Sequence, residues 1–367
     1  MSTNPDALIV GGGIVGAACA DALCREGMRV TIVESHIPGG GDTAAGMGHI
    51  VVMDDSEAQF ALTNYSRNLW KDLAPELPPE VEYDVCGTLW VAADEQEMEL
   101  VRAKHALYSN RGVETQILDE KSLAEAEPNL RPGLAGALRA PGDSVLYAPC
   151  AARWLARNAT ILAGKQVTAA GAGGVTLSDG TKLSAGLTIG ASGIAASDLF
   201  PEIEIRPRKG HLAITDRYPG FLRHQLVELG YLKSAHSHAL ESVAFNAQPR
   251  RTGQVLIGSS RQYVHENAAI DSRVLSRMLS RAIEYMPRLG NLPVIRVWTG
   301  FRSATADNLP FIGPHPRQRG LYLAGGHEGL GITTSLATAR LIADLILGRT
   351  PAIDPAPYLP SRLCPNS

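Results

Sequence analysis

The sequence predicts a mixed α/β (α+β) protein of two domains, one with a parallel β-sheet and one with a mostly antiparallel sheet. Three observations predict this class. Near the start, an apolar run over residues 7–10 leads into glycines, a helical pattern and a second apolar run over residues 29–34. Residues 321–347 repeat this order of strand, glycine turn and helix, which is typical of parallel sheets covered by helices. Between them, residues 210–261 alternate short β-like segments with turn residues, as antiparallel sheets do.

Length and composition exclude several classes of protein. The chain has 367 residues, enough for about two domains of ordinary size. A hydrophobic share of 45% with 19% charged residues favours a folded chain, and a net charge of −3 gives no electrostatic footprint for nucleic acid or an anionic membrane. The five cysteines form no CxxC pair, so the sequence offers no zinc or iron–sulfur ligand set. An odd cysteine count suits a reducing compartment, and we expect a cytoplasmic protein without a membrane span.

The remaining pattern supplies the other elements in order. Residues 39–48 are too rich in glycine for regular structure, and we expect a loop that contacts a ligand. The apolar spacing over residues 57–73 predicts a helix with one buried face. The other predicted elements are a β segment over 81–92, a helix over 95–110, hairpin turns at 171–174 and 178–180, a buried strand over 187–190, a strand over 225–233 and a helix over 271–286.

The first glycine turn has the pattern of a dinucleotide-binding motif. Gly11, Gly13 and Gly16 follow a predicted strand and open a predicted helix, and Glu34 ends the next strand. In this Rossmann-like context, Gly11 permits the tight turn, Gly13 lets a pyrophosphate approach the backbone, and Gly16 allows close helix packing. We expect Glu34 to accept hydrogen bonds from a ribose hydroxyl. The alternative is a glycine-rich turn of some other α/β protein.

The motif alone does not separate NAD from FAD, and two further features favour FAD. Residues 39–48, directly after Glu34, could wrap the phosphates of an extended cofactor. The turn over 326–333 supplies a second helix N-terminus, which suits the negative charge that develops on a reduced flavin. An NAD(P)H-dependent reductase stays an alternative, but it needs a second dinucleotide motif that the sequence lacks.

With these motifs, the chain resembles the FAD-dependent amine and amino-acid oxidoreductases, the family of D-amino-acid oxidase, glycine oxidase and sarcosine oxidase. The resemblance covers nearly the whole chain. It is carried by the first glycine motif, Thr43–Met47, Gly190–Gly193, Gly300–Gly313 and the closing glycine turn. In detail, residues 46–49 and 326–334 are similar to the FAD-bearing β subunit of hetero-oligomeric D-hydroxyproline dehydrogenases, with glycine oxidase and opine oxidase subunits close by.

The resemblance implies domain boundaries and a non-covalent FAD site. The FAD-binding domain would be discontinuous, over residues 1–55, 144–210 and 296–367, and the substrate domain would take 56–143 and 211–295. Glu34 and Ser35 would hold the ribose and the backbone of Val167 the adenine. The full predicted cofactor set is Gly11, Gly13, Ile14, Val15, Gly16, Glu34, Ser35, Thr43, Ala44, Ala45, Gly46, Met47, Val167, Ala191, Ser192, Gly193, Gly300, Arg302, Gly329, Leu330, Gly331, Ile332 and Thr333.

Four residues are candidates for the substrate site. Arg302 matches the family arginine that pairs with the substrate carboxylate, and the planar guanidinium suits such bidentate orientation. His327 in the closing turn would lie beside flavin or substrate, or pack there without acting as a base. Tyr231 and Glu241, on strands that roof the pocket in the family, would touch a ring hydroxyl or an amine. His49 is a weaker candidate for flavin contact.

The implied reaction is hydride transfer from the α-carbon of a small secondary or primary amino acid to flavin N5, giving an imine. The best candidate substrate is D-hydroxyproline or a proline-like imino acid. Electrons would pass to a partner or acceptor rather than chiefly to oxygen, and the protein would be an oligomer with a possible redox partner carrying an iron–sulfur cluster or further flavin. A peroxide-producing oxidase of glycine, sarcosine or D-amino acids, an opine oxidase subunit, and an electron-relaying or structural FAD subunit stay alternatives.

Overall fold

The computed structural model describes residues 4–230, 241–263 and 267–363. Its contacts divide the chain into two compact units. The first unit comprises Met1–Val81, Tyr147–Arg208 and Phe301–Ser367, and the second comprises Glu82–Leu146 and Lys209–Gly300. In this division, residues 56–81 belong with the first unit, whereas the sequence analysis assigns them to the substrate domain.

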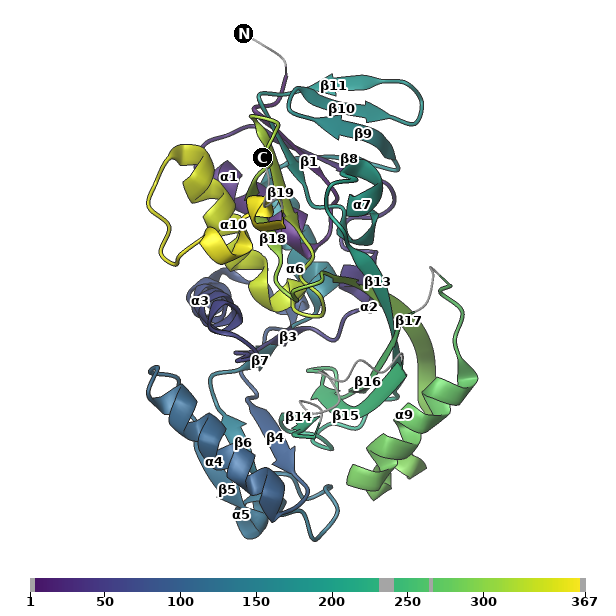
Figure 1. The fold of residues 1–367 in the computed structure, drawn as a ribbon. Helices are drawn as coiled ribbons and strands as arrows, with labels where there is room; N and C mark the ends of the chain where they lie inside the picture. Colours follow the sequence, from purple (N-terminus) through teal and green to yellow (C-terminus); the bar gives the residue numbers. More distant parts are fainter. Residues whose placement is uncertain (1–3, 231–240, 264–266, 364–367) are drawn as a thin grey trace. The chain divides into compact units, whose positions relative to one another are not determined.

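The first unit is built on a six-stranded sheet with the strand order β18-β19-β12-β1-β2-β8 (Figure 1). All neighbours in this order pair in parallel except β18 and β19, which are antiparallel. All four residues of β1 are buried, because helices cover one face of the sheet and a small sheet covers the other. The strands are β1 (Ala7–Val10), β2 (Val30–Glu34), β8 (Thr160–Ala163), β12 (Leu187–Gly190), β18 (Phe311–Pro314) and β19 (Leu321–Gly325).

Alternation along β1 decides which face each side chain covers. Leu8 and Val10 pack in one apolar cluster with Val175 and Leu177 of a three-stranded antiparallel sheet, in the order β11-β10-β9. Ile9, between them, points to the opposite face. The elements of the small sheet are β9 (Val167–Gly171), β10 (Gly174–Leu177) and β11 (Lys182–Ser184). This arrangement leaves the carboxyl ends of the parallel strands as the edge where the glycine turns begin.

Helix α1 packs against α10, and α10 packs against α3, so three segments far apart in sequence form one helical layer (Figure 1). Helix α3 begins where the side chain of Ser56 accepts a hydrogen bond from the backbone N–H of Gln59, as an N-cap residue does. The helices of this unit are α1 (Ile14–Arg25), α2 (Asp42–Ala45), α3 (Glu57–Leu73), α6 (Ala148–Leu155), α7 (Ala196–Leu199) and α10 (Gly331–Leu347), with a short strand β3 (His49–Ile50).

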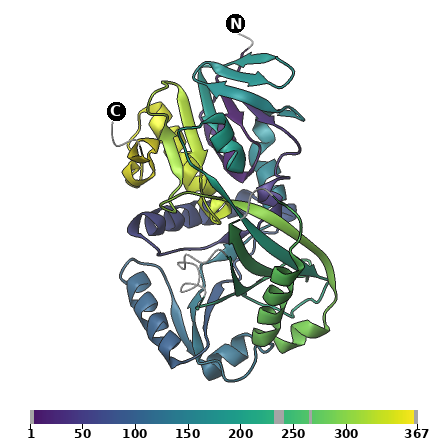
Figure 2. The ribbon, with the colours of Figure 1, turned by 45° about the vertical axis from the view of Figure 1, so that its right-hand side comes forward.

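The second unit contains most of an eight-stranded sheet in the order β17-β13-β16-β15-β14-β4-β6-β5 (Figure 2). Its pairs are antiparallel where their register is known, apart from the parallel pair β14 and β4. The ring of Phe245 stacks on Tyr285 of α9 with 4.7 Å between the centroids, which anchors that helix to the sheet. The helix predicted from the amphipathic pattern over residues 271–286 is confirmed, and it extends over Ser272–Tyr285.

The other elements of this unit have the following bounds. Its helices besides α9 are α4 (Glu95–Ser109) and α5 (Glu120–Ala126). Its strands are β4 (Thr88–Ala92), β5 (Gln116–Asp119), β6 (Gly136–Ala140), β7 (Ser144–Val145), β13 (Arg206–Thr215), β14 (Gln225–Glu228), β15 (Glu241–Pro249), β16 (Val255–Tyr263) and β17 (Val294–Ala304). Strands β13 and β17 have residues in both units.

Two predicted elements need correction. Residues 39–48 are not entirely irregular, because α2 forms over Asp42–Ala45, where the residues after the glycines favour helix and Asp42 lies in its first turn. The predicted β segment over 81–92 is shorter, since β4 begins at Thr88 and a 3-10 turn occupies Pro79–Val81. Residues 231–233 of the predicted strand 225–233 lie outside the described residues, and β14 ends at Glu228.

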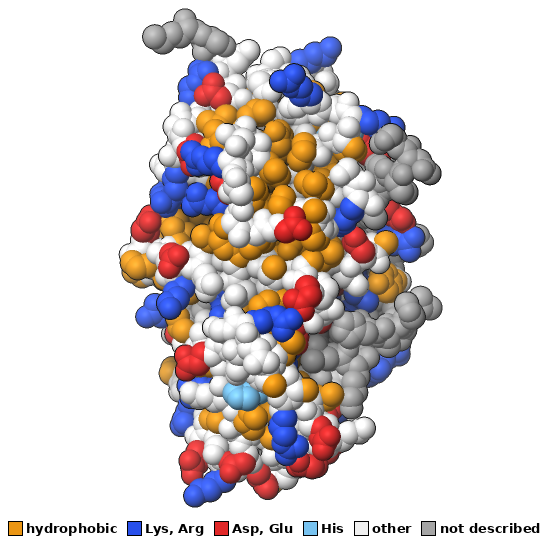
Figure 3. Space-filling model, turned by 60° about the vertical axis from the view of Figure 1, so that its left-hand side comes forward, with side chains coloured by type: hydrophobic (Ala, Val, Ile, Leu, Met, Phe, Trp, Pro, Cys, Tyr) orange, Lys and Arg blue, Asp and Glu red, His pale blue; other side chains and the backbone are white. Residues whose placement is uncertain are grey.

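The surface agrees with the small net charge. Acidic and basic side chains are interspersed over the face drawn in Figure 3, and hydrophobic side chains gather over its upper half. Within the described ranges, no helix is both long enough and apolar enough to cross a bilayer. Across the same ranges, no group of three or more His, Cys, Asp or Glu side chains is arranged to hold a metal ion.

Candidate active site

The first glycine turn is shaped by close backbone approach. Gly11 has a φ of +106°, and a Cβ built on it would lie 2.4 Å from the carbonyl oxygen of Ala191 at the end of β12. A Cβ on Gly16 would lie 2.1 Å from the carbonyl oxygen of Gly11. Both positions therefore exclude every residue with a side chain, and β1, the turn and α1 pack more tightly than any other residue would allow.

Helix α1 begins at Ile14 with an open N-terminus. Its N-cap is Gly13, which offers no side-chain hydrogen bond, and its first turn contains no acidic residue. The N–H of Ile14 donates to the hydroxyl of Thr43 at 2.9 Å. This bond ties residues 39–48, called the cofactor loop below, to the start of the helix. A helix N-terminus of this kind attracts a phosphate, because its backbone N–H groups and dipole both favour an anion.

Glu34 lies at the end of β2, beside the glycine turn. Its carboxylate accepts hydrogen bonds from the backbone N–H of Gly12 at 2.7 Å and of His36 at 2.9 Å. The hydroxyl of Ser35 donates to the same carboxylate at 3.2 Å. These contacts fix the carboxylate at the edge of the turn, the position from which such residues reach a ribose. The N–H of Lys165 bonds to the carbonyl of Glu34 at 3.0 Å, so the segment leading into Val167 runs past this point.

The loop over residues 39–48 lies against the start of α10. A Cβ on Gly46 would lie 2.9 Å from Cδ1 of Ile332. The hydroxyl of Thr333 donates to the carbonyl of His49 at 2.8 Å, and the indole N–H of Trp70 donates to the carbonyl of Ile332 at 3.3 Å. Two segments whose contacting residues lie 284 positions apart in the sequence thus meet at one helix N-terminus.

Two buried polar atoms in this region test whether the residues suit a flavin cofactor. Among the described residues, the hydroxyl of Ser192 and Nε2 of His49 are buried with no hydrogen-bond partner. Burial, with the nearby charge of Arg302 adding to it, lowers the pKa of His49 to about 3, so its ring is neutral. Buried polar groups are normally paired, and two that lack protein partners beside two open helix N-termini fit a polar, anionic cofactor. The residues present therefore fit FAD.

Arg302, on β17, lies beside the closing turn, the glycine-rich turn over residues 326–333. A Cβ on Gly329 would lie 3.2 Å from Nε of the Arg302 side chain, so the absence of a side chain at Gly329 makes room for the guanidinium. The N–H of Glu328 donates to the carbonyl of Ser303 at 3.0 Å, which joins the turn to β17. The predicted carboxylate clamp and the predicted flavin turn are thus neighbours within the first unit.

His327 is held inward. Its ring is 7% exposed, and Nε2 lies 3.0 Å from the hydroxyl of Thr338 on α10. Burial lowers the pKa of His327 to about 4, so the ring is neutral at neutral pH. The hydrogen bond favours the second interpretation of this residue, a packed histidine that does not act as a base. The predicted contact with flavin or substrate stays a prediction.

Two other predicted positions, Glu241 and Gly300, belong to the second unit. Glu241 on β15 forms ion pairs with Arg273, at 2.5 Å, and with Arg277. A carboxylate with two cations beside it is already compensated, and a role toward an amine stays a prediction. Tyr231 lies outside the described residues. Gly300 is the last residue of the second unit, and a cofactor contact there also stays a prediction.

The sequence analysis missed Asp42. Its Oδ1 accepts a hydrogen bond from the N–H of Phe301 at 3.3 Å, directly before Arg302. Burial raises the pKa of Asp42 to about 6, partly offset by that hydrogen bond. The signal in the sequence is a single acidic residue in a run of glycine, threonine and alanine, which the pattern alone does not connect to residue 301.

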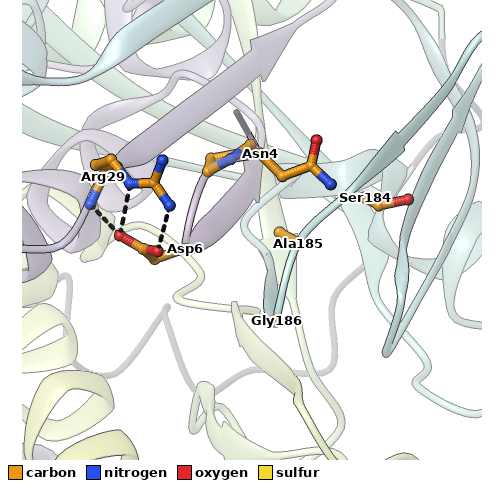
Figure 4. Close-up of a pocket in the computed structure, with 7 residues that line it drawn as sticks. Asn4, Asp6, Arg29, Ser184, Ala185 and Gly186 are labelled. Carbon is orange, nitrogen blue, oxygen red and sulfur yellow. Dashed lines mark hydrogen bonds and ion pairs between the residues drawn. The ribbon is translucent and has the colours of Figure 1, made fainter. Parts of the chain in front are cut away.

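A surface hollow elsewhere in the first unit is not this site. Its lining includes Asp6 and Arg29, joined by an ion pair of 2.8 Å (Figure 4). Both residues precede their strands, β1 and β2, so the hollow lies at the amino ends of the parallel strands. Ligands of such sheets bind at the carboxyl ends, where the glycine turns are. The other lining residues are Asn4, Pro5, Ser184, Ala185 and Gly186.

Comparisons with known proteins agree with this geometry. A family model described as FAD dependent oxidoreductase matches residues 6–345. The glycine oxidase of Geobacillus kaustophilus is 28% identical, with 98% of this chain and 97% of the relative covered. A glycine oxidase of Pseudomonas aeruginosa is 28% identical, covering 96% of this chain and 98% of the relative. A crystal structure of glycine oxidase from Geobacillus kaustophilus is similar with a TM-score of 0.87 at 27% identity, covering 98% of this chain and 99% of that one.

Proposed function

This chain belongs to the FAD-dependent oxidoreductase family, and from that premise we propose that it dehydrogenates a small secondary or primary amino acid, preferably D-hydroxyproline or a proline-like imino acid. It is an FAD-dependent amino-acid oxidoreductase that acts on amine donors. The observation that carries the proposal is the position of Arg302 beside Gly329, where the closing glycine turn meets β17. A cation there suits a substrate that bears a carboxylate next to its amine.

The residues of the first unit divide the work of binding the cofactor. The open N-terminus of α1, with Gly11 and Gly13, would hold the pyrophosphate, and Glu34 the ribose. The N-terminus of α10, which has no side-chain cap and no acidic residue in its first turn, would face the flavin. Bound FAD supplies an acceptor for the hydride that leaves the substrate α-carbon. The cysteines nearest in sequence to Arg302 are Cys150 and Cys364, which favours non-covalent attachment.

The task of the protein residues is to position the substrate. Arg302 would pair with the substrate carboxylate through two parallel hydrogen bonds, which fixes the direction of the α-carbon hydrogen. Neither His49 nor His327 carries a proton at neutral pH, because burial lowers the pKa of both rings. These two rings therefore add no positive charge that would compete with Arg302 for the carboxylate. Hydride transfer from a neutral amine needs no dedicated protein base, and the imine product can hydrolyse in water.

We infer that electrons then pass to a partner protein rather than chiefly to oxygen. The support is the similarity of residues 46–49 and 326–334 to the β subunits of hetero-oligomeric dehydrogenases. Since the sequence has no cysteine pattern for an iron–sulfur cluster, any such relay would belong to another subunit. The second candidate, a peroxide-producing oxidase, is favoured by the relatives named glycine oxidase.

One experiment tests substrate and acceptor together. The FAD-loaded protein is mixed without oxygen with D-hydroxyproline, proline, sarcosine, glycine and an opine, and loss of the flavin absorbance is followed. We expect the proline-like compounds to bleach the flavin fastest. Turnover is then compared between oxygen and an artificial dye as acceptor. Faster turnover with the dye supports the dehydrogenase, whereas rapid peroxide formation by the isolated chain supports the oxidase. Failure of every amino acid to bleach the flavin would overturn the proposal.

A further inference from the structure

Asp42 is a half-buried carboxyl at the meeting point of three chain segments. It lies in the short helix α2, directly after three glycines. Its Oδ1 accepts the hydrogen bond from the N–H of Phe301 at 3.3 Å, across 259 residues of sequence. A Cβ on Gly193, after β12, would lie 3.4 Å from its other oxygen. This side chain of the 39–48 loop therefore bonds to strand β17 and lies beside the turn after β12.

The place of Asp42 is fixed by its neighbour in sequence. The hydroxyl of Thr43 accepts the hydrogen bond from the N–H of Ile14 at 2.9 Å, so α2 is tied to the start of α1. The carbonyl of Gly41 accepts from the N–H of Ala44 at 2.9 Å, which closes the first turn of α2. The backbone that carries Asp42 is thus tied to the start of α1.

The hydrogen bond from Phe301 acts on the residue that follows it. The N–H of Phe301 fixes the peptide unit directly before Arg302. On its other side, the Arg302 side chain lies against Gly329, where a Cβ would come within 3.2 Å of Nε. The residue before Arg302 is therefore hydrogen-bonded to Asp42, while the Arg302 side chain lies beside the closing turn. A displacement of about 1 Å in such a group can cost a large part of the rate.

Placing a carboxyl group here costs free energy that a neutral polar side chain in the same loop would not. Burial of an ionisable group is unfavourable unless its oxygens are satisfied, and the N–H of Phe301 satisfies one of them. A serine in the same helix would be cheaper to bury. The reach of the aspartate side chain to β17 is what a shorter residue cannot reproduce.

We propose that Asp42 is a positioning residue for Arg302, which couples the place of the substrate arginine to the turn that binds the cofactor pyrophosphate. The inference rests on the proposed role of Arg302 toward the substrate carboxylate. It makes no claim that Asp42 touches the substrate.

The test measures binding of acetate, the smallest carboxylate probe, to the FAD-loaded protein through its effect on the flavin spectrum. We expect Asp42→Ala to weaken acetate binding about tenfold, the usual effect of removing one hydrogen bond to a charged group. Affinity for FAD, measured by fluorescence titration, should change less than about threefold on the same scale. Asp42→Asn keeps an acceptor oxygen of the same reach, and it should restore acetate affinity to near the wild-type value.

Further variants keep the result decisive. Asp42→Ser retains a polar residue in the first turn of α2 but cannot reach Phe301, so it should behave as Asp42→Ala even where the alanine variant folds poorly. Asp198→Ala, at an exposed acidic residue in the short helix α7, is the matched control and should leave both affinities unchanged. With substrate, the serine variant should raise KM more than it lowers kcat.

The outcomes separate the inference from the function it rests on. If Arg302→Ala leaves acetate binding unchanged, the role of Arg302 fails and the inference fails with it. If Arg302→Ala abolishes acetate binding while Asp42→Ala and Asp42→Ser bind acetate as the wild type does, the inference alone is overturned. Loss of FAD without a change in acetate affinity at full FAD loading would equally overturn it, because Asp42 would then serve the cofactor loop only.

Discussion

The guanidinium of Arg208 donates a hydrogen bond of 3.2 Å to the carboxylate of Glu328, and both side chains are largely buried, at 9% and 14% exposure. Glu328 occupies the closing turn with a φ of +51°, a conformation that side-chain-bearing residues rarely adopt. Its other carboxylate oxygen accepts from the N–H of Gly329 at 2.6 Å. The ion pair thus holds the turn that lies beside Arg302 in a strained shape.

Replacement of Glu328 should reveal how the ion pair and the backbone strain each contribute to the free energy of unfolding. We expect Glu328→Ala to lower the free energy of unfolding by about 2–3 kcal/mol, because it leaves the Arg208 charge buried without this partner. Glu328→Gly should cost about 1 kcal/mol less, since glycine adopts positive φ without strain. Denaturant unfolding of the FAD-loaded protein measures both. Arg29→Ala, which removes an exposed ion pair to Asp6, is the control and should lower the free energy of unfolding much less than Glu328→Ala does, because water screens exposed pairs. Equal costs for the alanine and glycine variants would contradict the strain.

Gly11 should be intolerant of alanine for two separable reasons. The new Cβ would lie 2.4 Å from the Ala191 carbonyl, and the φ of +106° is itself unfavourable for alanine. Gly27→Ala is the matched control, because Gly27 has a φ of +80° with nothing within 4 Å of its Cβ. We expect Gly27→Ala to cost about 1–2 kcal/mol and to bind FAD normally. Gly11→Ala should cost more and lose FAD, as measured by the flavin absorbance of the purified protein. Full FAD content in Gly11→Ala would contradict this prediction, because the turn would then accommodate a Cβ beside the Ala191 carbonyl.

The sequence predicts those parts of the site that depend on neighbours along the chain. The glycine motif, Glu34 and the closing turn are found from local spacing, because a strand, a tight turn and a helix follow one another within about 30 residues. Asp42 could not be found in this way, since its partner Phe301 lies 259 residues further on. The inward position of His327 depends on packing against Thr338, which a turn pattern does not show. Helix α2 has only four residues, directly after the glycines, and is too short for a helical period to be recognised in the sequence.

Arg302 should determine affinity for the substrate carboxylate and not for FAD. We expect Arg302→Ala to raise KM at least about 100-fold, since a bidentate charged pair is lost, while FAD stays bound. Arg302→Lys keeps the charge but loses the fork geometry, and it should recover only part of the affinity. Steady-state kinetics with the compound that bleaches the flavin fastest gives both values. Unaltered kinetics in Arg302→Ala would favour the alternative in which the chain relays electrons without a substrate pocket of its own.

His327 should make the protein less stable as the pH falls. Its pKa in the folded protein is lowered to about 4 by burial, from an ordinary value of 6.5. Between these two values the unfolded chain binds more protons than the folded one, so the free energy of unfolding must decrease as the pH is lowered from about 6.5 towards 4. The difference of 2.5 between the two pKa values corresponds to about 3 kcal/mol at full protonation, as an order of magnitude. Above pH 7 the ring is neutral in both states and contributes no slope.

The glutamine variant isolates this contribution. Gln at position 327 can still hydrogen-bond Thr338 but takes up no proton, so His327→Gln should flatten the pH dependence of unfolding by up to one proton between pH 6.5 and 4. His49, whose pKa is lowered to about 3, and His211, whose pKa is also lowered by burial, still contribute to the slope in this variant. Because the ring is already neutral in the working range, the pH profile of kcat should keep its shape in His327→Gln. A profile that loses its acidic limb in that variant would instead identify His327 as a group that titrates during turnover.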